Sequence, residues 1–227
     1  MVLHAGNYQS YIEDLKERKA PDADQPHPVV NEKLVRRRAG AVRSQRPKLR
    51  TGRNAMSLIS QALNARMNEQ IGHEFGASLQ YVNIAAYFDD VGLPVLTQHF
   101  FRQADEEREH AMKFVRYILD AGGHVAIPAI PAPRPEFASA EEAVALALEW
   151  EYTVTKQINS LLDLASSERD YVAHDFLEWF AREQLEEVSS MDTLLKMIRR
   201  SGESGLMLVD NALASGRALS LGGPPKE

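Results

Sequence analysis

The feature that most restricts the fold of this 227-residue chain is a helical spacing of apolar residues over four long stretches. In each stretch the apolar residues recur at alternating intervals of three and four positions, which is the period of an amphipathic α-helix. The sequence therefore predicts four helices of about 28–33 residues, each about 45 Å long. The apolar stripes cover residues 63–88, 100–118, 144–165 and 176–198.

The connections between these stretches indicate how the helices pair. Short turns at 89–94 and 166–170 join the first helix to the second and the third to the fourth, so each pair should form an antiparallel hairpin. Residues 124–137 contain four prolines and predict an extended crossing between the hairpins. Ser139 and Glu142 form a capping-box pattern that opens the third helix. The predicted fold class is all-α, a four-helix bundle with one long crossover.

Pattern and composition divide the chain into three parts. The bundle is expected over residues 56–215, where Gly202 ends the fourth helix and residues 205–213 form a short fifth helix. Residues 1–55 are poor in aromatic residues and broken by prolines, which is typical of a flexible extension. Residues 216–227 are expected to be a flexible C-terminal tail.

The net charge of −6 conceals a strong asymmetry between the extension and the rest. Residues 1–55 contain 12 Lys and Arg against 6 Asp and Glu, whereas residues 56–227 contain 14 against 26. Nine of the basic residues lie within 33–53. The two parts are therefore expected to have different partners.

Three interpretations of residues 1–55 stay open. Residues 33–53 could bind DNA or another polyanion through phosphate contacts. The extension could instead be a passive disordered tail in which residues 8–19 form one short helix. Translation could also begin at Met56, since the sequence from that residue reads as a complete beginning. The C-terminal tail is either a disordered end or a short peptide that docks to a larger compartment.

Several classes of protein are excluded or disfavoured by composition. The chain has no Cys, which rules out disulfide, zinc–thiolate and iron–sulfur sites. No apolar stretch approaches the roughly 20 residues that span a bilayer, and the N-terminus lacks the pattern of a secretion signal. We therefore expect a cytoplasmic protein without a membrane partner.

Each apolar stripe is interrupted near its middle by residues that can bind a metal. Because helix midpoints in an antiparallel bundle lie at about the same height, these groups should converge in the core. Burying ionised carboxylates without a partner costs several kcal/mol each, and no Lys or Arg lies on the stripes near this level. The interrupting residues are Glu74, Glu107, His110, Glu151, Gln184 and Glu187.

A bound cation would stabilise this set of side chains. Carboxylates with one imidazole suit Fe(II) or Mn(II) better than copper or structural zinc, and the set is large enough for two ions that share a bridging carboxylate. Any single Glu could instead be a boundary residue with its head in water, and His110 could be a hydrogen-bonded, half-buried His. Such explanations become improbable when all four stripes show the same interruption.

The motifs on these helices resemble those of the non-haem bacterial ferritins over about residues 56–215. The resemblance rests on NEQIGHEF and QYVNIAAYF in the first helix, A-x-E-E-x-x-H-A in the second, E-x-x-x-T in the third and W-F-x-x-E-Q-x-E-E in the fourth. The spacing is also specific, with 33 residues from Glu74 to Glu107, 44 from Glu107 to Glu151 and 33 from Glu151 to Gln184.

The resemblance implies a pair of iron sites. Glu74, Glu107 and His110 match the ligands of the first iron. Glu107 would bridge to a second iron, and the residues that would serve this second position are Glu151, Glu187 and the nearby Gln184.

Further residues match less central parts of the family's site. Glu106, Glu183 and Glu186 match an acidic cluster that forms a third iron position. Tyr81 matches a tyrosine beside the iron pair that could donate an electron. Ordinary core packing explains Tyr81 equally well. Trp179 could act in the same way, although core packing is the better explanation for it.

The family implies a hollow shell of 24 subunits in which Fe(II) is oxidised by O₂ or H₂O₂ and kept as a ferric mineral. Haem is not expected, because Arg108 stands where haem-binding relatives have Met and because Gln184–Glu187 lacks their Glu-x-x-His. Rubrerythrins are excluded by the missing Cys. The alternatives are a DNA-binding protective protein that uses the basic arm, and a structural bundle with a vestigial centre.

Overall fold

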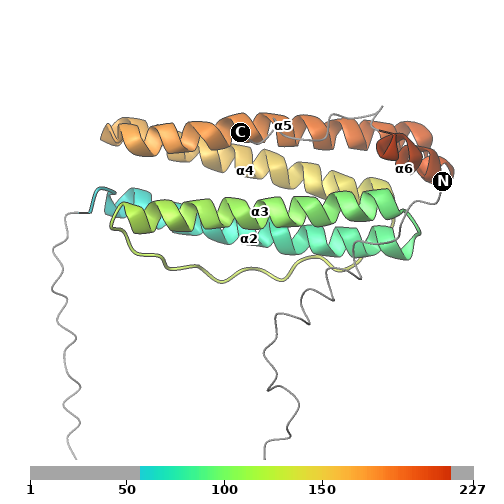
Figure 1. Ribbon diagram of the computed structural model, residues 1–227, viewed down its shortest axis with the longest axis horizontal. Helices are drawn as coiled ribbons and strands as arrows, with labels where there is room; N and C mark the ends of the chain where they lie inside the picture. Colours follow the sequence, from blue (N-terminus) through green and yellow to red (C-terminus); the bar gives the residue numbers. More distant parts are fainter. Residues whose placement is uncertain (1–56, 216–227) are drawn as a thin grey trace, which may run out of the picture. The chain divides into compact units, whose positions relative to one another are not determined.

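The computed structural model describes residues 57–215 (Figure 1). The predicted extension over 1–55, with its helix at 8–19 and its basic stretch at 33–53, lies outside the described residues, as do Met56 and the tail at 216–227. The described part is helical throughout apart from its turns and one long connection. Its elements are α2 (Gln61–Asp90), α3 (Pro94–Asp120), α4 (Ala140–Glu168), α5 (Tyr171–Ser201), the 3-10 turn η1 (Glu203–Gly205) and α6 (Leu206–Ala214).

The predicted four helices and short fifth helix are confirmed, with both short turns shorter than expected. The turn predicted at 89–94 occupies only residues 91–93, since α2 ends at Asp90 and α3 begins at Pro94. The turn at 166–170 reduces to two residues, since α4 continues to Glu168 and α5 begins at Tyr171. Arg169 ends α4 in the left-handed conformation at φ 57°, and the Asp170 side chain accepts a hydrogen bond from the Ala173 N–H to begin α5. Arg169 and Asp170 are sufficient to reverse the chain, so the polar residues 166–168, which were expected in the turn, remain part of α4.

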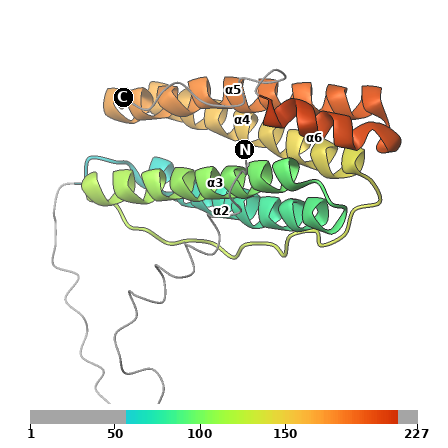
Figure 2. The same ribbon diagram turned by 45° about the vertical axis from the view of Figure 1, so that its right-hand side comes forward.

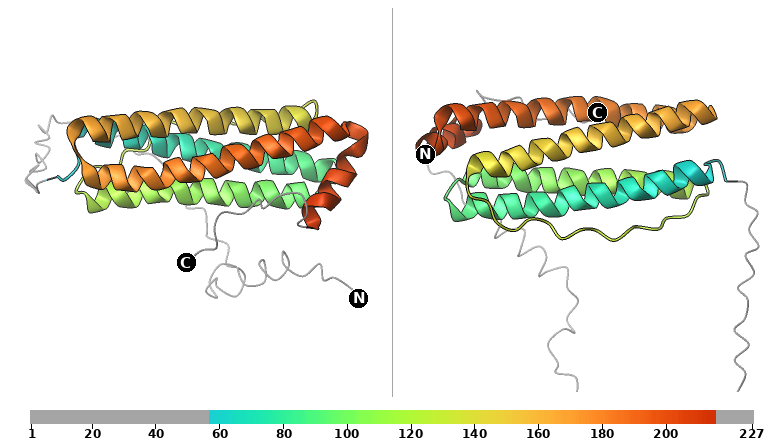
Figure 3. Two further views of the ribbon diagram at one scale, coloured as in Figure 1. Left: turned by 90° about the horizontal axis from the view of Figure 1, so that it is seen from above. Right: turned by 180° about the vertical axis from the view of Figure 1, so that it is seen from behind.

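The helices form two antiparallel hairpins stacked as two layers, α2 with α3 and α4 with α5 (Figure 1, Figure 2). The crossing between the hairpins runs as an extended strap along α2 for most of its length (Figure 3). At one end of the bundle α6 lies across α3 and α5 (Figure 3). This is the predicted bundle with one long crossover. Among residues 57–215, no helix is long and apolar enough to cross a membrane.

Side chains of α2 hold the strap by its backbone. Asn64 and Asn68 donate to the His124 carbonyl at 3.0 and 2.9 Å, and Asn68 accepts from the Ala126 N–H. Gln80 donates to the Arg134 carbonyl and accepts from its N–H. These bonds satisfy backbone groups of a proline-rich segment that has no secondary structure of its own.

The N-terminus of α3 is capped from a distant part of the chain. Leu93 precedes this helix and offers no side-chain cap. Asp210 of α6 takes that role, and its buried carboxylate accepts hydrogen bonds from the N–H groups of Val95 and Leu96. The carboxylate also lies at the favourable end of the helix dipole, so this contact fixes α6 against the bundle.

Two apolar clusters fill the bundle on either side of its middle. One contains Phe88, Phe100 and Leu194, and the other contains Ile71, Phe114 and further residues of the opposite half. Phe176, which the sequence pattern places in the core stripe, is only partly buried. Ala173 and Leu177 are buried in its place, so the inward face of α5 departs from the predicted stripe at this first position, while the remaining stripe residues from Phe180 to Ile198 are buried as predicted.

Gly72 permits the close approach of the strap to α2. A Cβ atom at this position would lie 2.5 Å from Pro128 Cγ. We expect Gly72→Ala to lower the midpoint of thermal unfolding, because overpacking costs about 1–3 kcal/mol and exceeds the gain in helix propensity of about 1 kcal/mol. Gly76→Ala is the matched control, since its Cβ would lie 3.1 Å from Trp150 and should be better tolerated. Pro128→Ala should partly restore the Gly72→Ala variant. A Gly72→Ala variant as stable as the parent would contradict this account.

Candidate metal centre

Four carboxyl groups, one imidazole and one amide are buried between the two apolar clusters. They come from all four long helices, and each side chain is at most 7% exposed. The helical period places each of them on the inward stripe of its helix. The structure thus brings together all six groups that the sequence pattern places at this level, namely Glu74 on α2, Glu107 and His110 on α3, Glu151 on α4, and Gln184 and Glu187 on α5.

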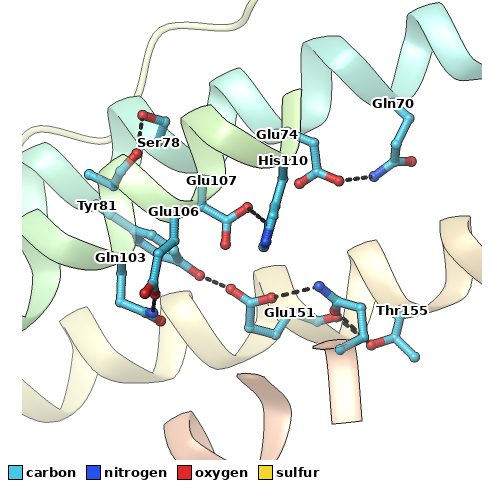
Figure 4. A network of polar contacts seen from close by, with 12 residues as sticks. Gln70, Glu74, Ser78, Tyr81, Gln103, Glu106, Glu107, His110, Glu151 and Thr155 are labelled. Atoms are coloured by element: carbon cyan, nitrogen blue, oxygen red, sulfur yellow. Dashed lines mark hydrogen bonds and ion pairs between the residues drawn. The ribbon is translucent and has the colours of Figure 1, made fainter. Parts of the chain in front are cut away.

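The α2 and α3 groups form a compact trio (Figure 4). One potential ligand atom from each of Glu74, Glu107 and His110 lies within 4.8 Å of the other two, a grouping that could hold a metal ion. The Glu107 Oε2 and His110 Nδ1 atoms are 3.4 Å apart. Gln70, one turn before Glu74, donates a 3.0 Å hydrogen bond to Glu74 Oε1 and orients that carboxylate.

The α4 and α5 groups form a second, hydrogen-bonded half of the centre. The buried Tyr81 hydroxyl donates to Glu151 Oε1, and the Gln184 amide lies 3.4 Å from Glu151 Oε2 (Figure 4). Thr155 donates to Gln184 Oε1 at 3.0 Å. The chain Thr155–Gln184–Glu151–Tyr81 therefore fixes the orientation of the Glu151 carboxylate.

Glu187 connects the centre to an acidic edge. Gln103 contacts Glu187 and donates to Glu106, and Glu106 and Glu183 act on Glu187 as nearby negative charges. Glu106 is exposed and Glu183 is partly buried. Glu186, the third acidic residue expected at this edge, is exposed on α5.

The four buried carboxyl groups resist ionisation. Burial raises the pKa of Glu74 and Glu107 well above the usual range, and neighbouring carboxylates raise the pKa of both further. Burial likewise raises the pKa of Glu151, and burial followed by the charge of Glu151 raises the pKa of Glu187 to about 9.

Several buried atoms at this level have no hydrogen-bond partner. They are Glu74 Oε2, both carboxylate oxygens of Glu107 and His110 Nδ1. Unpaired buried oxygens and nitrogens are costly, and all four atoms are ligand types that divalent cations bind. A cation at the trio would satisfy them and would favour the ionised carboxylates.

Aromatic rings surround the imidazole on its α5 side. The His110 ring lies edge to face with Trp179 and Phe180 at centroid distances of 5.6 and 5.7 Å. Tyr81 packs against Phe100 on the other side of the centre at 5.8 Å. The apolar surroundings lower the local dielectric and strengthen any interaction with a bound charge.

Three residues that orient the centre were not singled out in the sequence. Gln70 lies on the α2 stripe four residues before Glu74, and Thr155 closes the E-x-x-x-T motif, so both carried a signal. Gln103 carried none, because its contact to Glu187 depends on how α3 packs against α5. Such contacts are a property of the tertiary structure.

Comparison with protein families and known sequences adds independent information. Residues 64–201, more than half of the chain, match the family described as "Ferritin-like domain". The chain is 45% identical over 151 residues to a "Ferritin BfrB" of Mycobacterium tuberculosis (strain ATCC 35801 / TMC 107 / Erdman), covering 66% of this chain and 83% of that protein. It is 37% identical over 160 residues to a "Bacterial non-heme ferritin" of Staphylococcus saprophyticus, covering 70% and 96%.

Solved structures show the same fold. An "open pore ferritin" from the archaeon Archaeoglobus fulgidus superimposes with a TM-score of 0.66 at 33% identity. The match covers 69% of this chain and 98% of that one. The described bundle therefore corresponds to nearly the whole archaeal subunit, and residues outside it are additional to that subunit.

The raised carboxyl pKa values predict an unusual pH dependence of stability. Between pH 4.5 and about 9 the folded metal-free protein keeps the Glu187 proton that the unfolded chain releases. The free energy of unfolding should therefore fall as pH rises through this window, by about 1.4 kcal/mol per pH unit for each such carboxyl group. Thermal unfolding at pH 6 and pH 8 in a chelating buffer measures how steeply the free energy of unfolding changes with pH. Glu187→Gln should reduce the slope by about 1.4 kcal/mol per pH unit, because the other buried carboxyl groups still contribute. Without the chelator, a redox-inert ion such as Zn(II) should stabilise the protein most at pH 8. A metal-free protein that gains stability from pH 6 to pH 8 would refute this prediction.

Proposed function

This chain belongs to the ferritin family, and from that premise we propose that it oxidises Fe(II) at the buried centre and stores the ferric product inside a homo-oligomeric shell. The observation that supports this most is the set of four buried carboxyl groups on four helices, with unpaired oxygens on Glu74 and Glu107. Iron is here the substrate, with O₂ or H₂O₂ as the electron acceptor.

The proposed reaction depends on two adjacent iron positions. Glu74, Glu107 and His110 would bind the first Fe(II), and Glu107 would bridge to a second position served by Glu151, Glu187 and Gln184. Two Fe(II) ions supply two electrons, and reduction of O₂ to H₂O₂ consumes these electrons with two protons. The carboxyl groups hold protons before iron enters, since burial raises the pKa of each. Binding of iron would therefore release protons at the place where O₂ takes them up.

Two further roles belong to this proposal. Glu106, Glu183 and Glu186 would form a third iron position at the acidic edge, from which iron leaves the pair. Tyr81 would donate an electron when iron is scarce, and its hydrogen bond to Glu151 gives its proton an acceptor. The acidic surplus of residues 56–227 would attract Fe(II) and assist mineral formation.

A shell of 24 subunits in the cytoplasm completes the proposal. Its support is the likeness of the described bundle to ferritin subunits and the position of α6 across one bundle end, where it is available for contact with other subunits. DNA binding through residues 33–53 remains the alternative function, and the comparisons give it no support.

Substitution of the bridging carboxylate tests the oxidation centre. We expect Glu107→Gln to slow aerobic Fe(II) oxidation by about a hundredfold or more, because it removes a ligand common to both proposed positions. Absorbance of the ferric product in stopped flow gives the rate. Glu109→Gln is the matched control, since Glu109 is exposed on the same helix two residues away. Equal rates for Glu107→Gln and the parent, with unchanged helical content, would remove this assignment.

Particle size measured together with iron content tests storage. After aerobic loading with Fe(II), sedimentation should show one large, closed assembly that retains far more iron than its subunits have binding sites. A monomer or dimer that retains no iron after gel filtration would defeat the storage proposal, even if oxidation is rapid.

A further inference from the structure

Trp179 contacts both the proposed iron ligand His110 and a cation. Its ring centroid is 5.6 Å from that of His110. The ammonium nitrogen of Lys113 lies 3.4 Å from the indole ring of Trp179. Lys113 follows His110 by three residues on α3, so both side chains lie on the same side of that helix, facing Trp179 on α5.

The centre thus has two oxidisable rings in opposite electrostatic surroundings. Tyr81 donates a hydrogen bond to Glu151, which, once ionised by binding iron, can accept the hydroxyl proton when the ring loses an electron. Trp179 carries a positive charge against its ring, and a cation over an indole stabilises the electron-rich neutral ring. Loss of an electron from this ring would place two positive charges in contact.

We propose that Lys113 keeps Trp179 reduced, so that an electron taken from the protein during iron oxidation comes from Tyr81 and not from Trp179. The inference rests on the proposed iron oxidation, and its physical basis is the cation–π contact between Lys113 and Trp179. Lys113 is therefore a positioning residue for electron flow, and it neither binds iron nor touches O₂.

The choice between Tyr81 and Trp179 as electron donor arises when fewer than four Fe(II) are available for each O₂. Full reduction of O₂ to two waters takes four electrons and four protons. Three Fe(II) supply three electrons, and a side chain must supply the fourth. Oxidation of Tyr81 sends its electron to O₂ and its proton to Glu151. Oxidation of Trp179 would send its electron to O₂ and its indole proton to water, leaving a radical on a partly buried ring beside a proposed ligand.

Photochemical oxidation of the metal-free full chain tests the proposal without iron. Flash-generated tris(bipyridine)ruthenium(III) takes one electron from an indole and becomes ruthenium(II), and transient absorption records the indolyl radical. The transient absorption of the parent minus that of the Trp179→Phe variant gives the signal that comes from Trp179. We expect Lys113→Met, which keeps an aliphatic stem of similar length, to raise this signal about fivefold, whereas Lys113→Arg, which keeps the charge, should leave it unchanged.

Arg182→Met is the matched control for general charge effects on the cationic oxidant. Arg182 lies one turn after Trp179 on α5, and its partner is Glu178 at 3.6 Å. An unchanged signal in this variant supports a specific role for Lys113. An increase equal to that of Lys113→Met, or no increase in Lys113→Met itself, overturns the proposal.

A second measurement connects the contact to turnover. With three Fe(II) per O₂, freeze-quenched samples should give a tyrosyl radical in the parent and an indolyl radical in Lys113→Met, as distinguished by electron paramagnetic resonance. An indolyl radical in the parent refutes the proposal. If the protein oxidises no Fe(II), the proposed function fails, and the photochemical result still decides the role of Lys113.

Discussion

The burial of four carboxyl groups at one level of the bundle is the constraint on which the rest of the structure depends. Each would cost several kcal/mol if it were ionised without a partner. The metal-free fold meets this cost by keeping protons on the carboxyl groups, as the raised pKa of Glu187 illustrates. A bound divalent cation would offset the same cost by neutralising the negative charge of the ionised carboxylates. The same burial therefore connects metal affinity, proton release and stability, and it needs rigid apolar packing above and below the centre.

The helices achieve this rigidity by devices that lie far from the centre. The strap is hydrogen bonded to asparagine and glutamine side chains of α2, and Gly72 lets Pro128 approach that helix two residues before Glu74. Asp210 of α6 caps α3, the helix that supplies Glu107 and His110. Because the ligand positions are set by helix packing, a shift of the strap or of α6 would be transmitted to the centre.

The two halves of the centre differ in how many hydrogen bonds orient their side chains in the metal-free protein. On the α4 and α5 side, Glu151 already accepts from Tyr81 and lies beside the Gln184 amide, so its orientation is fixed before any ion binds. On the α2 and α3 side, both Glu107 oxygens and His110 Nδ1 lack hydrogen-bond partners, and the only contact between them is the 3.4 Å approach of Glu107 Oε2 to His110 Nδ1. In the proposed centre, the trio with unsatisfied atoms would therefore bind the first ion, and the hydrogen-bonded half would bind the second.

The helices, their pairing and the six buried groups were all predictable from the amino-acid sequence, because a period of 3.6 residues assigns every position to a face and a polar residue on an apolar stripe stands out. The family motifs extended that set to Tyr81 and to the acidic edge. Three contacts followed only from the packing of the helices: Gln103 of α3 contacts Glu187 of α5, Asp210 caps a helix 115 residues earlier, and Lys113 lies over Trp179. These contacts join different helices, and their existence depends on the rotation and offset of one helix against another, which a one-dimensional pattern does not specify.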